Sequence, residues 1–188
     1  MTTMTRDILS ALPGFQAPET GVFFAQLEDQ SRRLTEDTRG LTVDELAWQP
    51  QPGMNTIGML LAHIAVVEVY WTANVTRTEC RCPEVLGIED SDDGMPLPAG
   101  GEPPAGLKGK GLSYFDDLLA RARRNTREKL GPLRPEELDD TVEVKPRDGV
   151  LYRMNRRWIL YHMVEHEAGH YGQVNLLRHL YRTNRGGS

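Results

Sequence analysis

The sequence is poor in cysteine and has no excess of positive charge. Its two cysteines, Cys80 and Cys82, are separated by a single residue. That spacing suits neither a disulfide framework nor a C-x-x-C metal or redox motif, so we interpret both as loop residues and leave a reactive role open. The formal net charge is −5. This balance argues against nucleic acid as a partner, because phosphate binding needs a basic surface.

Long apolar runs are also lacking. No run of consecutive apolar residues approaches the roughly 18 of a membrane span, and the opening MTTMTRDILS lacks the apolar segment of a signal peptide. The hydrophobic content of 39% and charged content of 26% are typical of a globular protein. We therefore expect a single domain over residues 1–188, no membrane partner and a cytoplasmic, reducing location.

Histidines are present, and four of the five lie between residues 158 and 180, in WILYHMVEHEAGHYGQVNLLRHL. The apolar spacing predicts a long amphipathic helix. At about 100° per residue, His162, His166, His170 and Gln173 fall within the apolar stripe, and His179 falls outside it. Imidazoles at i and i+4 are neighbours that can share a cation. A pair alone is weak evidence, because a buried histidine more often bonds a carbonyl, so a third ligand is required.

The third ligand is available in a second apolar segment, residues 55–75, which reads NTIGMLLAHIAVVEVYWTANV. Asn55 or Thr56 can cap this predicted helix after the Pro52-Gly53 breaker. His63 shares its core-facing stripe with Met59 and Leu60. Three histidines around one ion, with an open position, is a common catalytic arrangement. Two pairs on the long helix remain open as the partners of His63: His166 with His170, or His162 with His166.

These two segments resemble the DinB/YfiT-like superfamily of four-helix metalloproteins. The resemblance implies an all-α four-helix bundle with a long crossover between helices two and three. His63 matches the family's second-helix ligand, His166 and His170 match its H-x-x-x-H pair, and Gly172-Gln173 matches the trailing G-Q. With this match we predict that His63, His166 and His170 are the ligands, and that His162 instead makes a hydrogen bond one turn away. Gly169 departs from the pattern, since many members carry His or Arg there.

The remaining segments can be placed around the two helices. Residues 1–18 form a lead, and a first helix is expected from about 19 to 39, followed by a capped turn at 42–45. The second helix should last until about Thr78. Residues 83–112 are the expected crossover, with five Pro and seven Gly between Pro83 and Gly111. Its acidic run, residues 89–93, is interpreted as a solvated face.

The third helix is expected at 113–130, with Ser113 as its N-cap. Its basic residues are interpreted as a solvated face; they are Arg121, Arg123, Arg124, Arg127 and Lys129. A small hairpin is expected between Leu138 and Tyr152, although Pro146 weakens that prediction. Asn155 is then expected to cap the fourth helix.

The resemblance also implies a function. Several members are transferases that use low-molecular-weight thiols such as bacillithiol or mycothiol, and members often form homodimers. We therefore expect a small-molecule substrate and one divalent ion, zinc or nickel first, that binds the thiol as a thiolate ready to attack. Gln173 is expected to support a ligand or the substrate, and Arg178 to contact the carboxylate of a thiol.

Two alternatives stay open. A metal-dependent hydrolase would activate water at the same site and would need a carboxylate base, for which Glu68, Glu165 and Glu167 are candidates. The helical wheel turns Glu68 away from His63. A non-catalytic, stress-related metal-binding protein would use the ion only to hold two helices together.

Overall fold

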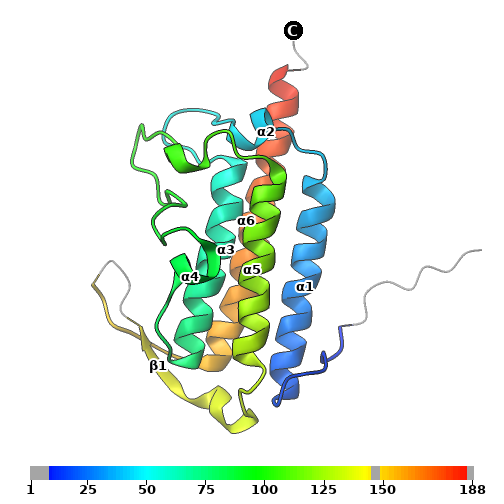
Figure 1. Ribbon diagram of the computed structural model, residues 1–188, viewed down its shortest axis with the longest axis vertical. Coiled ribbons are helices and arrows are strands. Elements are labelled where there is room, and N and C mark those ends of the chain that lie inside the picture. Colours follow the sequence, from blue (N-terminus) through cyan, green and yellow to red (C-terminus); the bar gives the residue numbers. More distant parts are fainter. Residues whose placement is uncertain (1–8, 145–148, 186–188) are drawn as a thin grey trace, which may run out of the picture.

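The computed structural model describes residues 9–144 and 149–185 and shows a four-helix bundle (Figure 1). The four long helices are α1 (Pro18–Thr38), α3 (Ile57–Thr76), α5 (Leu112–Leu130) and α6 (Arg156–Arg185). In Figure 1, α1 and α6 run upward, whereas α3 and α5 run downward side by side. The predicted all-α four-helix fold is confirmed.

Helix α3 is the central element. It packs on both α5 and α6, and its residues from Ile57 to Ala62 are almost completely buried. A helix that is apolar on all sides must be enclosed by other elements. By length and composition α3 could cross a membrane, but 72% of the apolar window is buried within the bundle. Enclosure by the other helices therefore accounts for its composition.

Side-chain caps set the starts of three helices, α2 (Val43–Ala47), α3 and α6. Thr42 and Glu45 form a capping box at α2, and the Thr56 hydroxyl accepts a hydrogen bond from the backbone N–H of Met59 at 3.1 Å. Asn155 caps α6 as predicted, since its Oδ1 accepts from the backbone N–H of Trp158 at 2.8 Å. The prediction for Ser113 was wrong. Helix α5 begins one residue earlier, at Leu112, with Gly111 in the N-cap position and no side-chain cap.

The crossover, residues 83–112, connects the lower end of α3 to the upper end of α5 (Figure 1). It contains most of the short helix α4 (Cys82–Leu86) and the 3₁₀ turn η1 (Ala105–Leu107). The backbone N–H of Gly53 donates to the carbonyl of Gly101 at 2.8 Å. Gly53 has φ +90°, and a Cβ there would meet the Gly100 nitrogen at 2.8 Å, so only glycine fits this contact. A backbone hydrogen bond therefore holds the crossover against the segment that precedes α3.

The base of the bundle carries the 3₁₀ helix η2 (Pro135–Asp139) and the predicted hairpin. Strands β1 (Thr141–Val144) and β2 (Tyr152–Asn155) pair antiparallel, with Val142 opposite Met154. Pro146, which weakened that prediction, lies outside the described residues. The described part of the lead contacts the bundle, since the Gln16 backbone N–H donates to the Gly131 carbonyl at 2.9 Å.

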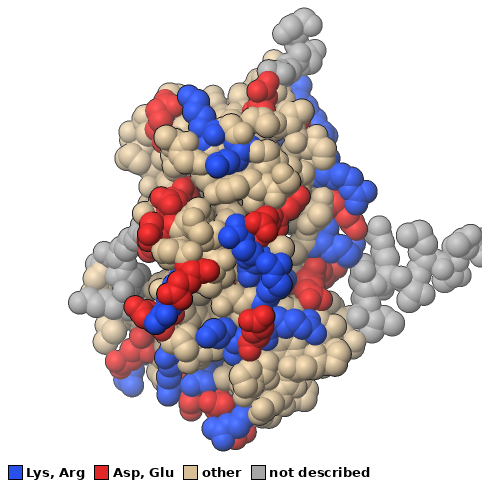
Figure 2. Space-filling view, in the orientation of Figure 1, with Lys and Arg blue, Asp and Glu red and all other residues tan. Residues whose placement is uncertain are grey.

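Charges of both signs are mixed over the face shown in Figure 2. Acidic and basic side chains alternate along α5 and the hairpin, and neither sign forms a continuous patch on this face. An electrostatic footprint for nucleic acid would require clustered basic residues. The face in view does not have one.

Candidate metal centre

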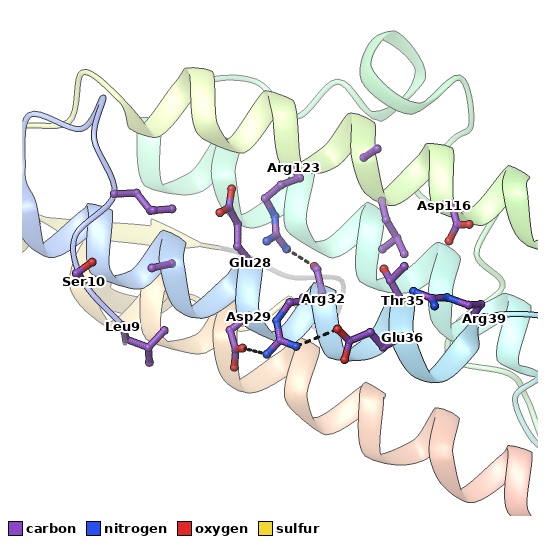
Figure 3. Close-up of a pocket in the computed structure, with 15 residues that line it drawn as sticks. Leu9, Ser10, Glu28, Asp29, Arg32, Thr35, Glu36, Arg39, Asp116 and Arg123 are labelled. Carbon is purple, nitrogen blue, oxygen red and sulfur yellow. Dashed lines mark hydrogen bonds and ion pairs between the residues drawn. The ribbon is translucent and has the colours of Figure 1, made fainter. Parts of the chain in front are cut away.

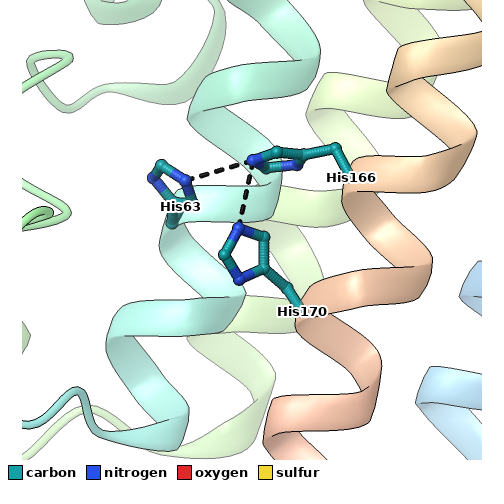
Figure 4. A group of neighbouring side chains, drawn as sticks. All are labelled: His63, His166 and His170. Carbon is teal, nitrogen blue, oxygen red and sulfur yellow. Dashed lines mark hydrogen bonds between the residues drawn. The ribbon is translucent and has the colours of Figure 1, made fainter.

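Helices α3 and α6 bring the three predicted histidines together (Figure 4). The Nε2 atom of His166 lies 3.2 Å from Nε2 of His63 and 3.1 Å from Nε2 of His170. One ligand atom from each of the three rings fits within a span of 4.8 Å. In a tetrahedral site with metal–nitrogen bonds of about 2.0–2.1 Å, ligand nitrogens are about 3.3 Å apart. The spacing of the three rings therefore suits a single divalent ion.

The outer nitrogens of two rings are held by hydrogen bonds. Nδ1 of His63 lies 2.8 Å from Oδ2 of Asp93, and Nδ1 of His170 lies 2.9 Å from Oε1 of Gln173. Both oxygens can only accept, so each Nδ1 carries the proton and each Nε2 presents a lone pair to the centre. His166 can donate its Nε2 proton to only one of them. A bound cation would accept the lone pairs of all three Nε2 atoms, so these three imidazole nitrogens fit a metal ion.

Burial keeps His166 and His170 in the form that binds metal. Burial, and then the neighbouring rings of His170 and His63, lower the pKa of His166 to about 3. Burial also lowers the pKa of His170. Neutral imidazole is the protonation state that coordinates a metal ion. All three histidines nonetheless remain partly exposed.

Asp93 is the functional residue that sequence reasoning missed. The acidic run at 89–93 was expected to form a solvated face, but Asp93 is only 2% exposed. Its Oδ1 accepts the backbone N–H of Met95 at 2.9 Å, while its Oδ2 holds His63. A carboxylate behind a ligating histidine fixes the orientation of the ring and raises its basicity. Nothing in five consecutive polar residues signals which one turns inward.

His162 stands outside the triad. Its ring stacks on Trp158 with the centroids 4.9 Å apart, and it meets the edge of Trp71 at 5.2 Å. Its Nδ1 lies 3.4 Å from a carboxylate oxygen of Glu165, on the next turn of α6. Aromatic packing therefore accounts for the position of His162 on the stripe.

Two of the candidate carboxylate bases are held by Arg123. Its Nε donates to Glu68 at 2.9 Å and its Nη2 to Glu167 at 3.0 Å, and the Ser31 hydroxyl donates to Glu167 at 2.5 Å. The expectation that Arg123 lies on a solvated face was wrong, because its side chain points between the helices and is only 15% exposed. Buried carboxylates require a paired cation, and this position on α5 supplies it.

Arg178 lies two helical turns beyond His170, on the side of α6 that faces α1. Its Nη1 donates to Asn175 at 2.8 Å and lies 3.8 Å from a carboxylate oxygen of Asp37. Tyr171 donates to the other oxygen of Asp37. These contacts connect α6 to α1, and none of them involves the triad.

A groove of about 850 Å³ lies between α1 and α5 (Figure 3). Arg32 in this groove pairs with Asp29 at 2.6 Å and with Glu36 at 3.0 Å, and Arg123 also lines it. The triad lies between α3 and α6 instead. A much smaller cavity, about 10 Å³, lies beside His166 and is lined by Glu68 and Glu167. The large groove is therefore separate from the metal centre.

Comparisons with known proteins agree with this geometry. A family model for mycothiol-S-transferase matches residues 22–183. A crystal structure described as a conserved protein from Enterococcus faecalis shares 19% sequence identity, with a TM-score of 0.61, over 86% of this chain and 95% of that one. That likeness concerns the fold alone. Among curated proteins no match was found. Since the family model covers most of the sequence, the chain belongs to the mycothiol-S-transferase family, which is one of the DinB/YfiT-like families.

Proposed function

We propose that this protein is a metal-dependent S-transferase that joins the sulfur of a low-molecular-weight thiol to an electrophilic small molecule. His63, His166 and His170 are the proposed ligands of one divalent ion. The observation that carries the proposal is the convergence of three Nε2 atoms, with the outer nitrogens of His63 and His170 held by Asp93 and Gln173. Membership of the mycothiol-S-transferase family supports the class of co-substrate, with mycothiol first.

The residues around the triad have distinct roles in this proposal. A divalent ion bound there supplies a Lewis acid that lowers the pKa of a thiol. Asp93 and Gln173 position two of the rings, and the partial exposure of the triad lets the thiol proton leave to solvent. The thiolate sulfur then forms a bond to the electrophilic carbon, and the leaving group departs with the bonding electron pair.

The contacts of the carboxylates favour thiol transfer over hydrolysis. Glu68 and Glu167 are bound to Arg123, and Glu165 lies beside His162. Asp93 already accepts hydrogen bonds from His63 and from the backbone of Met95. A hydrolase would need a carboxylate free to take a proton from water. Each carboxylate that the sequence offered as a base therefore already contacts another side chain.

The test is a rate measurement on protein loaded with zinc or nickel. A fluorogenic bimane electrophile is offered with mycothiol, bacillithiol or no thiol, and a panel of ester and amide substrates is run in parallel. We expect thiol-dependent conjugation that falls at least about 100-fold in His170→Ala, because a ligand is lost. His179→Ala is the matched control, since His179 is an exposed histidine of the same helix.

Three outcomes would contradict the proposal. Turnover of the hydrolase panel without thiol would favour a hydrolase. No turnover of either class, with a large drop in melting temperature of His170→Ala, would favour a structural ion. Absence of conjugation across the thiol panel with the metal fully occupied would remove the S-transferase. A cytoplasmic homodimer remains part of the proposal, and sedimentation velocity checks the dimer.

A further inference from the structure

The two cysteines, separated by Arg81 in the sequence, have neighbouring sulfur atoms. Sγ of Cys80 lies 3.6 Å from Sγ of Cys82. Cys82 is the first residue of α4 and is only 2% exposed, whereas Cys80 lies in the segment before α4 and is partly exposed. The pair therefore has one sulfur within reach of a small molecule and a second sulfur held behind it.

The surroundings give the two thiols different acidities. A hydrogen bond from the Cys82 thiol, with a smaller effect from the Cys82 backbone, lowers the pKa of Cys80 to about 7, against the opposing effects of burial and of Asp90. The same hydrogen bond, together with burial, raises the pKa of Cys82. Near neutral pH the accessible sulfur is thus the one with thiolate character, which is the form that attacks a disulfide.

The charged groups nearby are mainly acidic. The titratable groups that face the pair are Tyr70 of α3 and, in the crossover, Asp90 and Asp93. Arg81 turns to Glu79 and Glu84, at 3.1 Å from each. Arg81 is thus paired with carboxylates, and the hydrogen bonds from the thiol and from the backbone of Cys82 are what stabilise the thiolate. Acidic surroundings also disfavour an anionic substrate.

We propose that Cys80 and Cys82 form a redox-active dithiol that reduces small, uncharged or cationic disulfides. The Cys80 thiolate attacks one sulfur of the substrate, which breaks the substrate S–S bond and releases one thiol. Cys82 then loses its proton and attacks Sγ of Cys80, which releases the second thiol and leaves a Cys80–Cys82 disulfide. The two cysteines lose two electrons and two protons in total, and the substrate gains both.

The geometry permits the second step. A disulfide bond is about 2.05 Å long, so the two sulfurs must approach by roughly 1.5 Å from their present separation. Cys82 is anchored in α4, but Cys80 belongs to neither α3 nor α4. Movement of the Cys80 side chain can therefore close the gap without displacing a helix. This inference is independent of the proposed metal-dependent function, because neither cysteine is a member of the triad.

The test follows thiol–disulfide exchange on the full-length, metal-loaded protein by intact-mass spectrometry, with hydroxyethyl disulfide as the probe. Wild-type protein should lose two hydrogen masses and keep no adduct, and dithiothreitol should reverse the change. Cys82→Ser should accumulate one hydroxyethylthio adduct at Cys80, because the resolving sulfur is absent. Cys80→Ser should react at least tenfold more slowly.

The pH dependence provides a second readout. The rate for wild-type protein should rise with pH and level off above about 7, where Cys80 is already a thiolate. Cys82→Ala should shift that inflection upward, whereas Cys82→Ser, which keeps a hydroxyl donor, should shift it less. A stable adduct or disulfide-linked dimer in the wild type would overturn the proposal. A Cys80→Ser variant that reacts as fast as the wild type would also overturn it. The wild-type test, which looks for a stable adduct or dimer, does not depend on whether the variants fold.

Discussion

Asp93 differs from the other acidic residues of its run in what surrounds it. Glu89, Asp90 and Asp92 are exposed, whereas the carboxylate of Asp93 is enclosed between His63 and the backbone of Met95. A buried carboxylate that accepts two hydrogen bonds is costly to remove or neutralise. In the proposed site its partner is a metal ligand, so its effect should be seen in metal affinity.

We expect Asp93→Asn to weaken zinc binding about 10- to 100-fold, because His63 loses the acceptor that fixes its ring. A competition titration against a chromogenic chelator measures the change. Glu89→Gln removes an exposed carboxylate of the same run and should leave the affinity unchanged. Equal affinities for Asp93→Asn and wild type would show that Asp93 does not support the ion.

The histidines could be found from the sequence because helical periodicity is local information. The spacing of His166 and His170, and the apolar residues around His63, already specify which way each ring points. The roles of Asp93 and Arg123 depend on contacts with residues that are distant in the sequence. Asp93 lies 30 residues from His63, and Arg123 lies 55 residues from Glu68. The neighbouring sequence of a charged residue in a charged run does not indicate whether its side chain is buried or solvated.

At the scale of elements, Arg123 connects all four long helices. It comes from α5 and contacts Glu68 of α3, Glu167 of α6 and Ser31 of α1. Burial raises the pKa of Glu167, although Arg123 opposes that effect. Breaking a buried ion pair leaves an uncompensated charge, which is more costly than never having had the pair.

Arg123→Met should therefore lower the free energy of unfolding by about 3–5 kcal/mol. Arg124→Met, an exposed neighbour on the same helix, should change it by no more than about 0.5 kcal/mol. Urea denaturation of the three proteins at neutral pH measures both values. Similar midpoints for the two variants would mean that the buried network adds little to stability.

The short helix η2 carries a pH-dependent contribution to stability. The backbone N–H of Arg134 and then its guanidinium, with Arg156 as a further donor, hold the pKa of Glu137 at about 2. Because this pKa is below the ordinary value near 4.5, the contribution is complete above about pH 4.5. It is lost as the pH falls from there towards 2.

Glu137→Gln should be less stable than wild type at pH 7, and the difference should shrink as the pH is lowered below 4.5. Urea midpoints at a series of pH values give the comparison. Glu136→Gln serves as the control, since Glu136 makes only an exposed pair with Arg134. A difference that stays constant with pH would contradict the assignment to Glu137.

Element types were easier to predict than their ends and surroundings. Periodicity and caps specified the four helices and the hairpin, whereas α5 begins one residue before the expected start because Gly111 accepts the N-cap position. The short helix α4 was not expected within the proline- and glycine-rich segment. Cys82 and Leu86, which are buried against the core, stabilise it through long-range packing that the local sequence does not reveal.

For the molecule as a whole, ion binding should be coupled to unfolding. An ion present at about 100 times its dissociation constant stabilises the native state by about 2.7 kcal/mol. In a protein of this size that should raise the melting temperature by roughly 5–10 °C. Differential scanning calorimetry with zinc and with a chelator measures the shift. His170→Ala should abolish the shift and His179→Ala should retain it; an identical shift in both variants would place the ion elsewhere.

The separation of the triad along the chain also has a consequence for biosynthesis. His166 follows His63 by 103 residues, which a ribosome adds in about 5–20 s at roughly 5–20 residues per second. During that interval the nascent chain holds His63, and then Asp93, but neither of the two ligands from α6. The proposed ion therefore cannot be captured by its full ligand set until α6 has been made and has docked against α3. Metal loading is then a late event, and it selects chains in which α3 and α6 have already come together.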